Sequence, residues 1–511
     1  MVSRVKAAGI EGVNGYLIDV EVDVSQGLPS FDIVGLPDAA VRESRERVRA
    51  SIKNCGFDFP ARRITVNMAP ADKKKEGPLY DLPIFVAILA ATEQLRADLR
   101  DYAFIGELSL SGEIRPVRGV LPVVLALRDS GVQAVFLPRE NAAEAGVAGG
   151  VEILPAEHVS QVIDHVLGVL PIQPFHADDS IYSPLPEDFL DFADVAGQLM
   201  PKKALETAAA GGHNVLLIGP PGTGKSMLAK RLPSILPDMT FDEALETTKL
   251  YSVSGLLNPR RPFVSVRPFR APHHTISYAG MAGGGSSPRP GELSLAHNGV
   301  LFLDEVPEYN TSVLEVLRQP LEDGTVRISR VSAAVEYPCS IMLVCAMNPC
   351  KCGFYGHPTK ACRCSPKDID RYIGRVSGPL LDRIDIQVEV PAVSFADMSQ
   401  REKGEASDAI RRRVCAAREI QVKRYAGTGI ACNARLYGDL LRDCCKLDED
   451  ASLLLKRIFE TLALSARGYD RILKVARTIA DLKAHADITA ADIAEAAQYR
   501  ALDKKYFHSH V

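Results

Sequence analysis

The sequence predicts an α/β protein built from several domains, and three features indicate this fold class. Between about residues 190 and 395, short apolar segments of strand length alternate with helical segments, which is typical of a parallel sheet covered by helices. Residues 15–24 and 62–70 read as strands on either side of an amphipathic helix at 38–56, which indicates an α+β domain at the N-terminus. From about residue 396 onward, apolar residues recur at helical spacing.

A chain of 511 residues is too long for one hydrophobic core, and the patterns above divide it into domains. We predict an N-terminal domain over 1–172, a linker rich in Pro, Ser and Asp over 173–190, an α/β core over 191–395 and a helical domain over 396–511. No fixed-period repeat interrupts this order.

The composition is that of an ordinary globular protein, with 46% hydrophobic and 24% charged residues and a net charge of −4. There is no overall positive field to attract nucleic acid, so any DNA contact has to be local, for example inside a pore. No apolar run approaches the length of a membrane helix, and the N-terminus lacks the apolar core of a signal peptide. We expect a cytoplasmic protein with no membrane partner, whose 11 cysteines are reduced.

A phosphate-binding motif follows the strand expected at 215–218. The motif G-x-x-x-x-G-K-S leads into a helix, and its glycines let the backbone amides wrap phosphates at the start of that helix. Lys225 is expected to reach the β- and γ-phosphates of ATP, and Ser226 to coordinate Mg²⁺. The alternative is a Gly/Pro-rich turn that binds nothing, and the strand–loop–helix context disfavours it. The predicted ATP-binding residues are Gly219, Pro220, Pro221, Gly222, Thr223, Gly224, Lys225 and Ser226.

Two adjacent carboxylates, Asp304 and Glu305, end the apolar strand expected at 300–303. The carboxyl ends of parallel strands are where α/β folds bind their ligands. Asp304 is therefore expected to hold Mg²⁺ together with Ser226, and Glu305 to activate the attacking water. An acidic pair after a strand is usually a solvated loop, but its position downstream of a phosphate-binding motif favours the catalytic role.

Four cysteines form two C-x-C pairs within the loop 350–364. In a reducing compartment such a cluster is more typical of a tetrahedral Zn²⁺ site than of disulfides. The spacing is tighter than usual, so buried or redox-active thiols remain an alternative, and His357 could replace one ligand. A closed four-ligand site is structural, and we expect it to pin the long loop that follows Asn348. The predicted ligands are Cys350, Cys352, Cys362 and Cys364.

Several long motifs resemble one protein family. They are "RPFRAPHHTISYAGMAGGGSSPRPGELSLAHNGVLFLDE", "LRQPLEDGTVRISRV", "CAMNPCKCG" and "SGPLLDRIDI". These motifs resemble the magnesium-chelatase-like AAA+ family and, within it, the bacterial YifB/ComM group, over essentially the whole chain. The resemblance implies an N-terminal domain like that of Lon protease (the ribosomal S5 domain 2-like fold), an AAA+ P-loop core and a C-terminal helical lid.

The resemblance also implies a function. It suggests a homo-hexameric ring ATPase and, for the YifB/ComM group, a helicase that drives DNA branch migration during natural transformation. The expected partner is branched or single-stranded DNA without sequence preference, because no pattern of base-edge readout appears. The alternative is an ATPase that remodels protein partners, as in magnesium chelatase proper. The Lon-like domain and the cysteine loop match the YifB/ComM group and favour the DNA motor.

The AAA+ resemblance assigns further catalytic roles. Asn348 ends a third strand at the sensor-1 position, where it would orient the attacking water, unless it only caps a turn. Arg383 lies just before another strand, where an arginine reaches the γ-phosphate of the neighbouring subunit; a surface ion pair is the alternative, and Arg375 and Arg371 are the substitutes. In the lid, Arg467 is favoured over Arg471 as the sensor-2 arginine.

A hairpin is expected at 323–338, where Val326 and Ile328 alternate with Arg327 and Ser329, and Arg330 follows. In related ring helicases such a hairpin points into the pore, so both arginines are expected to bind DNA phosphates; an exposed hairpin with polar decoration is the alternative. The Gly/Pro-rich segment before Asp304 contains His273 and His274, for which metal ligation and turn capping both remain open.

The Lon-like domain lacks the residues of a protease. In the segments that resemble the catalytic segments of Lon, the position of the nucleophilic serine is Leu79 and the position of the lysine is Val123. Because a Ser–Lys dyad needs both groups, the sequence argues against proteolysis.

Overall fold

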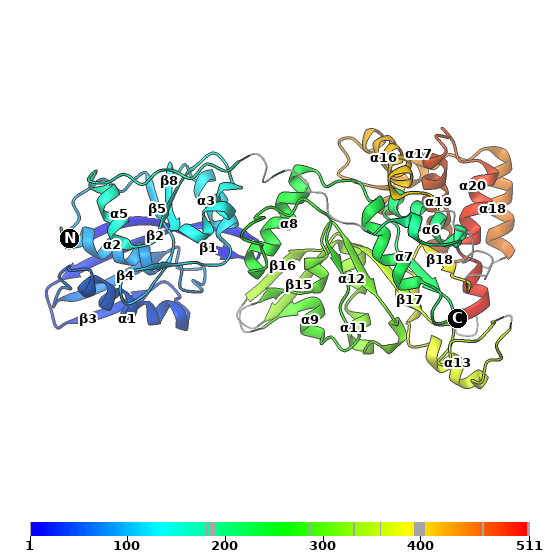
Figure 1. Cartoon of the computed structure of the whole chain (residues 1–511), viewed down its shortest axis with the longest axis horizontal. Coiled ribbons are helices and arrows are strands. Elements are labelled where there is room, and N and C mark those ends of the chain that lie inside the picture. Colours follow the sequence, from blue (N-terminus) through cyan, green and yellow to red (C-terminus); the bar gives the residue numbers. More distant parts are fainter. Residues whose placement is uncertain are drawn as a thin grey trace. The chain divides into compact units, whose positions relative to one another are not determined.

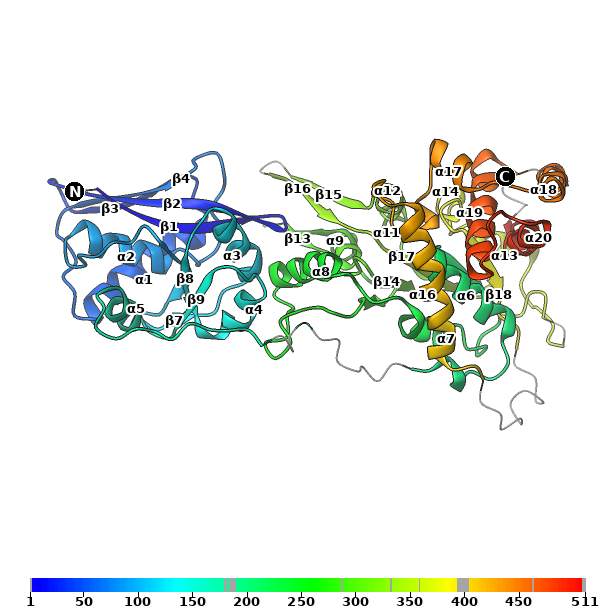
Figure 2. The same cartoon turned by 90° about the horizontal axis from the view of Figure 1, so that it is seen from above.

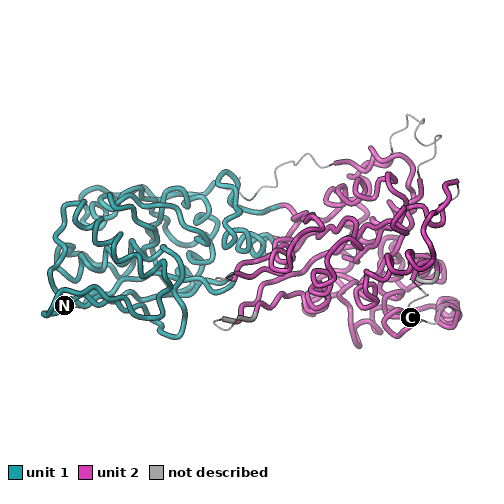
Figure 3. Tube along the Cα trace, turned by 90° about the horizontal axis from the view of Figure 1, so that it is seen from below, with its two compact units in different colours: residues 1–184, 241–265 teal, residues 185–240, 266–511 magenta. Residues whose placement is uncertain are grey.

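The computed structural model of the chain describes residues 2–178, 182, 190–285, 288–330, 333–357, 359–392, 404–461 and 464–507. The chain forms two compact units, coloured teal and magenta in Figure 3. Unit 1 comprises Met1–Pro184 and Phe241–Ser265, and unit 2 comprises Leu185–Thr240 and Val266–Val511. The linker predicted at 173–190 falls largely outside the described residues, as does the predicted core–lid boundary at 395–396.

Unit 1 is built on one mixed sheet with the strand order β3-β4-β2-β1-β5-β8-β9. β1 pairs antiparallel with β2 and β2 with β4, whereas the remaining neighbours run parallel. A short hairpin, β6–β7, lies outside this sheet. The strands are β1 (Val2–Glu11), β2 (Asn14–Ser25), β3 (Ser30–Val34), β4 (Arg63–Ala69), β5 (Tyr102–Phe104), β6 (Glu107–Leu108), β7 (Ile114–Arg115), β8 (Ala134–Pro138) and β9 (Glu152–Ala156).

Helices cover one face of this sheet (Figure 2). Alternation along β4 explains the arrangement, because Ile64, Val66 and Met68 are buried while the residues between them are more exposed. The helix predicted at 38–56 is α1, and the Asp38 carboxylate caps it by accepting a hydrogen bond from the Val41 amide at 2.8 Å. The helices are α1 (Ala39–Asn54), α2 (Asp81–Ala91), α3 (Val120–Asp129), α4 (Ala142–Gly146) and α5 (Val159–Val166).

Unit 1 also contains α8 (Phe241–Ser254), which comes from the middle of the chain. Ser252 Oγ donates a hydrogen bond to Glu144 Oε1 at 2.5 Å, and the Ser252 carbonyl accepts one from the Gly119 amide at 3.2 Å. Phe241 and Phe263 pack their rings against each other, with centroids 5.7 Å apart. The sequence pattern, in which these residues lie within the α/β region, does not reveal this packing.

Unit 2 contains a parallel sheet with the order β11-β14-β17-β10-β18, which confirms the predicted α/β class (Figure 1). β10, β14 and β17 are wholly buried, as expected for central strands of a parallel sheet covered on both faces. The strands of the sheet are β10 (Val215–Ile218), β11 (Phe269–Arg270), β14 (Val300–Leu303), β17 (Met342–Met347) and β18 (Ile386–Glu389).

Smaller elements connect these strands. A two-stranded hairpin, β15–β16, precedes β17 and is seen along its length in Figure 2. The connecting elements are α6 (Leu199–Gly211), α7 (Lys225–Arg231), α9 (Tyr278–Ala282), β12 (Gly283–Gly284), β13 (Arg289–Pro290), α10 (Glu292–Leu295), α11 (Thr311–Glu315), α12 (Arg318–Asp323), β15 (Thr325–Arg330), β16 (Ala333–Pro338), α13 (Pro366–Ile373) and α14 (Gly378–Leu381).

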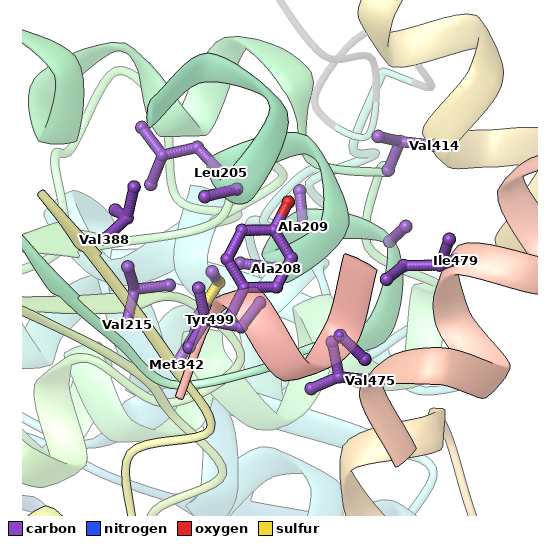
Figure 4. Packing of buried hydrophobic residues seen from close by; sticks show 14 of the residues in the cluster. Leu205, Ala208, Ala209, Val215, Met342, Val388, Val414, Val475, Ile479 and Tyr499 are labelled. Atoms are coloured by element: carbon purple, nitrogen blue, oxygen red, sulfur yellow. The ribbon is translucent and has the colours of Figure 1, made fainter. Parts of the chain in front are cut away.

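The C-terminal part of unit 2 is helical, as predicted, and shares one hydrophobic core with the sheet. Figure 4 shows Leu205 and Ala208 of α6 in one cluster with the sheet residue Val215 and the lid residues Ile479 and Tyr499. The lid helices are α16 (Ser407–Arg424), α17 (Gly438–Cys444), α18 (Glu449–Thr461), α19 (Ala466–Leu482) and α20 (Ala490–Gln498). Over the described residues, the helices all fall short of the length and apolar character needed to cross a membrane.

Candidate active site

The phosphate-binding motif leaves the carboxyl end of β10 and enters α7. Gly222 and Gly224 have φ angles of 77° and 86°, in the left-handed region that glycine adopts at little cost. A Cβ atom at Gly219 would collide with the backbone carbonyl of Val390 at the end of the neighbouring strand. The glycine spacing of the motif therefore meets the conformational needs of this turn.

Lys225 lies at the start of α7, with only 8% of its surface exposed. Its Nζ donates hydrogen bonds to the carbonyls of Gly219 and Pro220, both at 2.8 Å, and to Asn348 Oδ1 at 3.1 Å. Burial lowers the pKa of Lys225, an effect opposed by the charges of Asp304 and Glu305. The structure thus brings two predicted residues, Lys225 and Asn348, into direct contact.

Ser226 and Asp304 also meet, because β10 and β14 both flank β17 in the parallel sheet and their carboxyl ends lie at one edge. Ser226 Oγ donates a hydrogen bond to Asp304 Oδ2 at 2.5 Å. A hydroxyl and a carboxylate oxygen are the kinds of ligand that Mg²⁺ prefers. This oxygen pair beside a buried ammonium group fits a magnesium–nucleotide complex.

Glu305 is the more exposed member of the acidic pair, with 56% of its side chain exposed. Its backbone φ of 52° places it in the left-handed region, which turns its side chain out of the strand direction. The Nδ1 atom of His274 lies 3.9 Å from Glu305 Oε2. Sequence reasoning had considered His274 as a metal ligand or turn cap and had missed this proximity.

A largely apolar cavity of about 520 Å³ adjoins the phosphate-binding motif. The Gln198 side chain connects the two by donating hydrogen bonds to the carbonyls of Thr223 at 3.4 Å and Pro391 at 2.7 Å. Its Oε1 atom is buried and has no hydrogen-bond partner among the described residues. The apolar lining includes Leu199, Met200, Val388, Tyr499 and Leu502.

Sequence reasoning missed this cavity because it is formed by three distant segments. The segment 197–201 leads into the first turn of α6, residues 387–391 include the end of β18, and residues 498–502 begin at the last residue of α20. A flat, apolar ligand such as a purine base suits the size and the lining of this cavity.

The two candidate arginine fingers differ in exposure. Arg383 has 12% of its side chain exposed, donates a hydrogen bond to the Arg318 carbonyl at 2.8 Å and pairs with Glu322 at 2.5 Å. Arg375 has 51% exposed and donates a hydrogen bond to the Pro307 carbonyl at 3.0 Å. Arg375 also pairs with Glu308 at 3.3 Å, so both arginines have partners within their own chain and Arg375 differs in being the more exposed of the two.

The two candidate sensor-2 arginines lie at the start of α19. Arg467 has 63% of its side chain exposed and lies 3.9 Å from Asp382, whereas Arg471 has 9% exposed and lies 3.8 Å from both Asp382 and Asp385. Arg467 is thus accessible to a ligand, and Arg471 is held within a group of acidic residues.

The four cysteines of the loop come together, with all their Sγ atoms within 4.8 Å of one another. The Sγ–Sγ distances are 3.4 Å from Cys350 to Cys352, 3.7 Å from Cys350 to Cys362 and 3.6 Å from Cys352 to Cys362. His357 is not part of the group, and its Nδ1 accepts a hydrogen bond from the Lys360 amide at 3.1 Å. Four converging thiols match the ligand set of a tetrahedral zinc site.

The cysteine loop also contacts the phosphate-binding motif. Gly353 has a φ of 81°, and a Cβ atom there would lie 2.5 Å from Pro221 Cδ. The loop follows β17 directly. Its turn at Gly353 therefore packs against Pro221 of the motif, while Asn348, just after β17, contacts Lys225.

On the hairpin β15–β16, the alternation predicted from the sequence is visible. Val326 and Ile328 are buried, and Arg327 is exposed and paired with Glu336 at 2.8 Å. The backbone of Arg330 lies in β15, but its side chain is outside what the structure describes.

In unit 1, the two positions expected to hold a protease dyad are apolar and buried. Leu79 is 6% exposed and Val123 is 1% exposed. Neither can act as a nucleophile or a base.

Three family descriptions match the sequence. They are "Magnesium chelatase, subunit ChlI" for residues 191–398, "Subunit ChlI of Mg-chelatase" for residues 20–141 and "Magnesium chelatase, subunit ChlI C-terminal" for residues 404–500.

Two relatives match over nearly their full length. "Uncharacterized protein YifB" of Escherichia coli is 43% identical over 97% of this chain and 96% of its own. "Competence protein ComM" of Haemophilus influenzae is 44% identical over 96% of each chain. "Lon protease 2" of Bacillus subtilis is 27% identical over 35% of each chain, in agreement with the predicted likeness to Lon.

Proposed function

Because this chain belongs to the YifB/ComM group of magnesium-chelatase-like AAA+ ATPases, we propose that it is a ring-forming DNA motor that drives branch migration during natural transformation or recombination. The ATPase assignment rests on the family and on the convergence of Lys225, Ser226, Asp304 and Asn348 at one edge of a parallel sheet. That convergence is the observation that carries the ATPase part of the proposal.

The side chains of this site divide the chemistry of ATP hydrolysis among them. Lys225 supplies positive charge to the phosphates, and Ser226 and Asp304 would hold Mg²⁺, which adds further charge neutralisation when bound. Glu305 accepts the proton of the attacking water, and Asn348 orients that water. The adjoining cavity, which Gln198 lines, holds the base.

Three considerations support DNA as the substrate. A relative that matches 96% of this chain carries the name "Competence protein ComM". Arg327 on the hairpin is exposed, and its guanidinium group pairs with one carboxylate, that of Glu336. A DNA phosphate can therefore compete with Glu336 for this group. A hexameric ring would bring six such hairpins to one pore, and Arg383 or Arg375 would act on the ATP of the neighbouring subunit.

We also propose that the four cysteines of the loop bind a structural Zn²⁺ ion. Their sulfur atoms lie close enough for one ion, and the loop they hold touches Pro221. Purified protein is expected to contain about one equivalent of zinc per chain, as measured by elemental analysis, as a closed four-thiolate site requires. Cys350→Ala is expected to lose the metal. The control is Cys55→Ala, which removes a cysteine outside the cluster. Clean wild-type protein without zinc would contradict the proposal.

ATP turnover measured with and without DNA tests the DNA-motor proposal. Wild-type protein should hydrolyse ATP faster with forked or four-way-junction DNA, and Lys225→Ala should abolish both rates. Turnover that does not respond to any DNA at low or moderate salt would instead favour an ATPase that remodels protein partners, as the magnesium-chelatase likeness suggests.

A further inference from the structure

Unit 1 has a hollow with an excess of positive charge at the β3 edge of its sheet. The hollow has a volume of about 410 Å³ and is formed by residues of β3, β4 and α1 (Figure 1). We call it the arginine groove, and the residues that line it are Asp32, Ile33, Val34, Arg42, Arg45, Arg63 and Thr65. Among these described residues, three guanidinium groups share the groove with a single carboxylate, that of Asp32.

The groove arginines Arg42, Arg45 and Arg63 are exposed and lack acidic partners. Within the part of the chain that the structure describes, no carboxylate oxygen lies within 4.0 Å of their guanidinium nitrogens. Elsewhere in unit 1, exposed arginines do have such partners, since Arg96 pairs with Glu93 at 2.8 Å and Arg139 with Glu157 at 2.8 Å. The positive charge of the groove is therefore open to an anion from outside the chain.

The secondary structure holds the groove arginines around one hollow. Arg42 and Arg45 lie one turn apart on α1, which packs against β3, and Arg63 begins β4 opposite Ser30 of β3. Arg45 Nε donates a hydrogen bond to the Arg42 carbonyl at 3.1 Å, and Arg45 Nη1 donates one to the Phe31 carbonyl at 3.3 Å. These bonds fix the direction of the Arg45 side chain and leave its Nη2 group without a partner among the described residues.

Aromatic rings adjoin the groove. Phe31, next to the lining residue Asp32, packs against Phe59 with ring centroids 5.8 Å apart, and both side chains are partly exposed. Arg49 follows Arg45 by one turn of α1, and its guanidinium group lies over the Phe59 ring at 5.5 Å from the centroid. Guanidinium groups for phosphates beside flat faces for bases are the features with which proteins hold single-stranded nucleic acid.

We propose that the arginine groove of unit 1 binds the phosphates of single-stranded DNA, without sequence preference. A guanidinium group binds a phosphate through two parallel hydrogen bonds, and three such groups on a helix and a strand suit several successive phosphates better than one small anion. The inference rests on the proposed function, which supplies the DNA. It gives unit 1, which lacks the residues of a protease, a part in holding the DNA strand.

The test measures binding of a labelled single-stranded oligonucleotide to the full-length protein by fluorescence anisotropy over a range of salt concentrations. Replacing all three groove arginines by Gln is expected to weaken binding about tenfold or more at low salt. The slope of log K against log salt should fall by about 2, because each contact with a single strand contributes about 0.7. The control replaces Arg96, Arg100 and Arg139 by Gln, which removes the same charge from arginines that are paired, and should leave the slope unchanged.

Two further variants separate a loss of charge from a loss of structure. Arg42→Gln combined with Arg63→Gln keeps both hydrogen bonds of Arg45 and is expected to lower the slope by about 1.4, two contacts' worth. Asp32→Asn removes the carboxylate of the groove and is expected to strengthen DNA binding, a change that general damage to the fold would not produce. An unchanged affinity and slope in the triple variant, or weaker binding in Asp32→Asn, would overturn the proposal.

Two competitors test the identity of the anion. Tripolyphosphate and poly-glutamate are added to the complex at equal charge with unlabelled oligonucleotide, and the oligonucleotide should displace the label best. More efficient displacement by tripolyphosphate would overturn the proposal in favour of a small-anion site, and more efficient displacement by poly-glutamate would overturn it in favour of an acidic protein partner.

ATP turnover distinguishes failure of this proposal from failure of the proposed function. The triple variant should keep the wild-type rate of hydrolysis without DNA, because the groove lies outside the ATP site. DNA binding that depends on the groove, together with turnover that does not respond to DNA, supports the groove and contradicts the motor. DNA-stimulated turnover with wild-type binding in the triple variant overturns the groove alone, and wild-type protein that binds no DNA contradicts both.

Discussion

Lys225 and Glu305 are assigned different parts of the ATPase reaction, so their substitution should separate nucleotide binding from hydrolysis. Lys225→Ala removes charge-assisted hydrogen bonds and should weaken ATP binding by roughly 10- to 100-fold. Glu305→Gln keeps the shape of the side chain but removes the base, and should lower kcat by about 10²–10⁴-fold with little change in ATP affinity. Filter binding and phosphate release measure the two quantities. A Glu305→Gln protein with near-normal turnover would contradict the assignment.

Gln198 should control the choice of base. Gln198 lines the cavity, and a rotation of its side chain would turn the buried, unpaired oxygen toward the base, where it accepts a hydrogen bond from the amine of adenine but meets a carbonyl oxygen in guanine. Wild-type protein is expected to bind ATP more tightly than GTP, and Gln198→Leu should reduce this preference about 5- to 10-fold, the effect of one polar contact. Competition binding measures the ratio, and Gln498→Leu at the same cavity is the control. An unchanged ratio in Gln198→Leu would remove this residue from base recognition.

Among individual residues, the site residues that the sequence predicts best are those that follow strands. Lys225, Ser226, Asp304 and Asn348 meet because parallel strands bring their carboxyl ends to one edge, and each follows an apolar run that can be recognised locally. The neighbourhood of Gln198 is not predictable in this way, since it depends on segments about 190 to 300 residues apart in the chain.

Among the elements, the cysteine loop makes the most direct contact with the phosphate-binding motif. Gly353→Ala would place a methyl group 2.5 Å from Pro221 Cδ, so it should displace the motif and weaken ATP binding. Gly356→Ala is a matched control, because Gly356 has a similar φ of 74° but its nearest neighbour would lie 3.8 Å away. Both variants carry the same backbone strain of roughly 1–2 kcal/mol, so a difference in ATP affinity reports the contact alone. Equal affinities would contradict the coupling.

α8 should depend on Glu144 for its attachment to unit 1. Burial raises the pKa of Glu144, and the side chain accepts hydrogen bonds from Ser252 Oγ at 2.5 Å and the Leu121 amide at 3.0 Å. Glu144→Ala leaves these donors unpaired and should cost about 1–3 kcal/mol of stability. Amide hydrogen exchange should then quicken in α8. The exposed Glu140→Ala is the control, and equal exchange in both variants would show that Glu144 does not hold the helix.

Helices and strands whose apolar residues recur at a clear period are predicted well from the sequence. The helix at 38–56 is found as α1, and the strands at 15–24 and 62–70 correspond to β2 and β4. The attachment of α8 to unit 1 is not predictable, because its helical pattern indicates a buried face without indicating which surface covers it.

For the whole molecule, the ring proposal predicts that one subunit completes the active site of the next. Arg383→Ala and Lys225→Ala chains should each be inactive alone but recover partial ATP turnover when mixed. In the mixture, a Lys225→Ala chain can present an intact Arg383 to the ATP of its neighbour. Repeating the experiment with Arg375→Ala identifies the finger, since Arg375 is the more exposed of the two. No recovery with either arginine variant would argue against a shared site.

The parallel-sheet core and the helical C-terminal region could be predicted from the sequence, because the periodicity changes along the chain. The assignment of 241–265 to unit 1 could not, because the chain leaves unit 2 after Thr240 and re-enters it at Val266. Insertions of this kind are visible only in tertiary contacts.

The central claim is that ATP hydrolysis by this protein moves a DNA branch point, and branch migration of a labelled four-way junction tests it most directly. Wild-type protein with ATP and Mg²⁺ should convert the junction to its products, at a rate that falls as salt is raised. Glu305→Gln, which should still bind ATP, should leave the junction intact. Active ATP turnover by wild-type protein without any conversion of forked or four-way DNA would contradict the account.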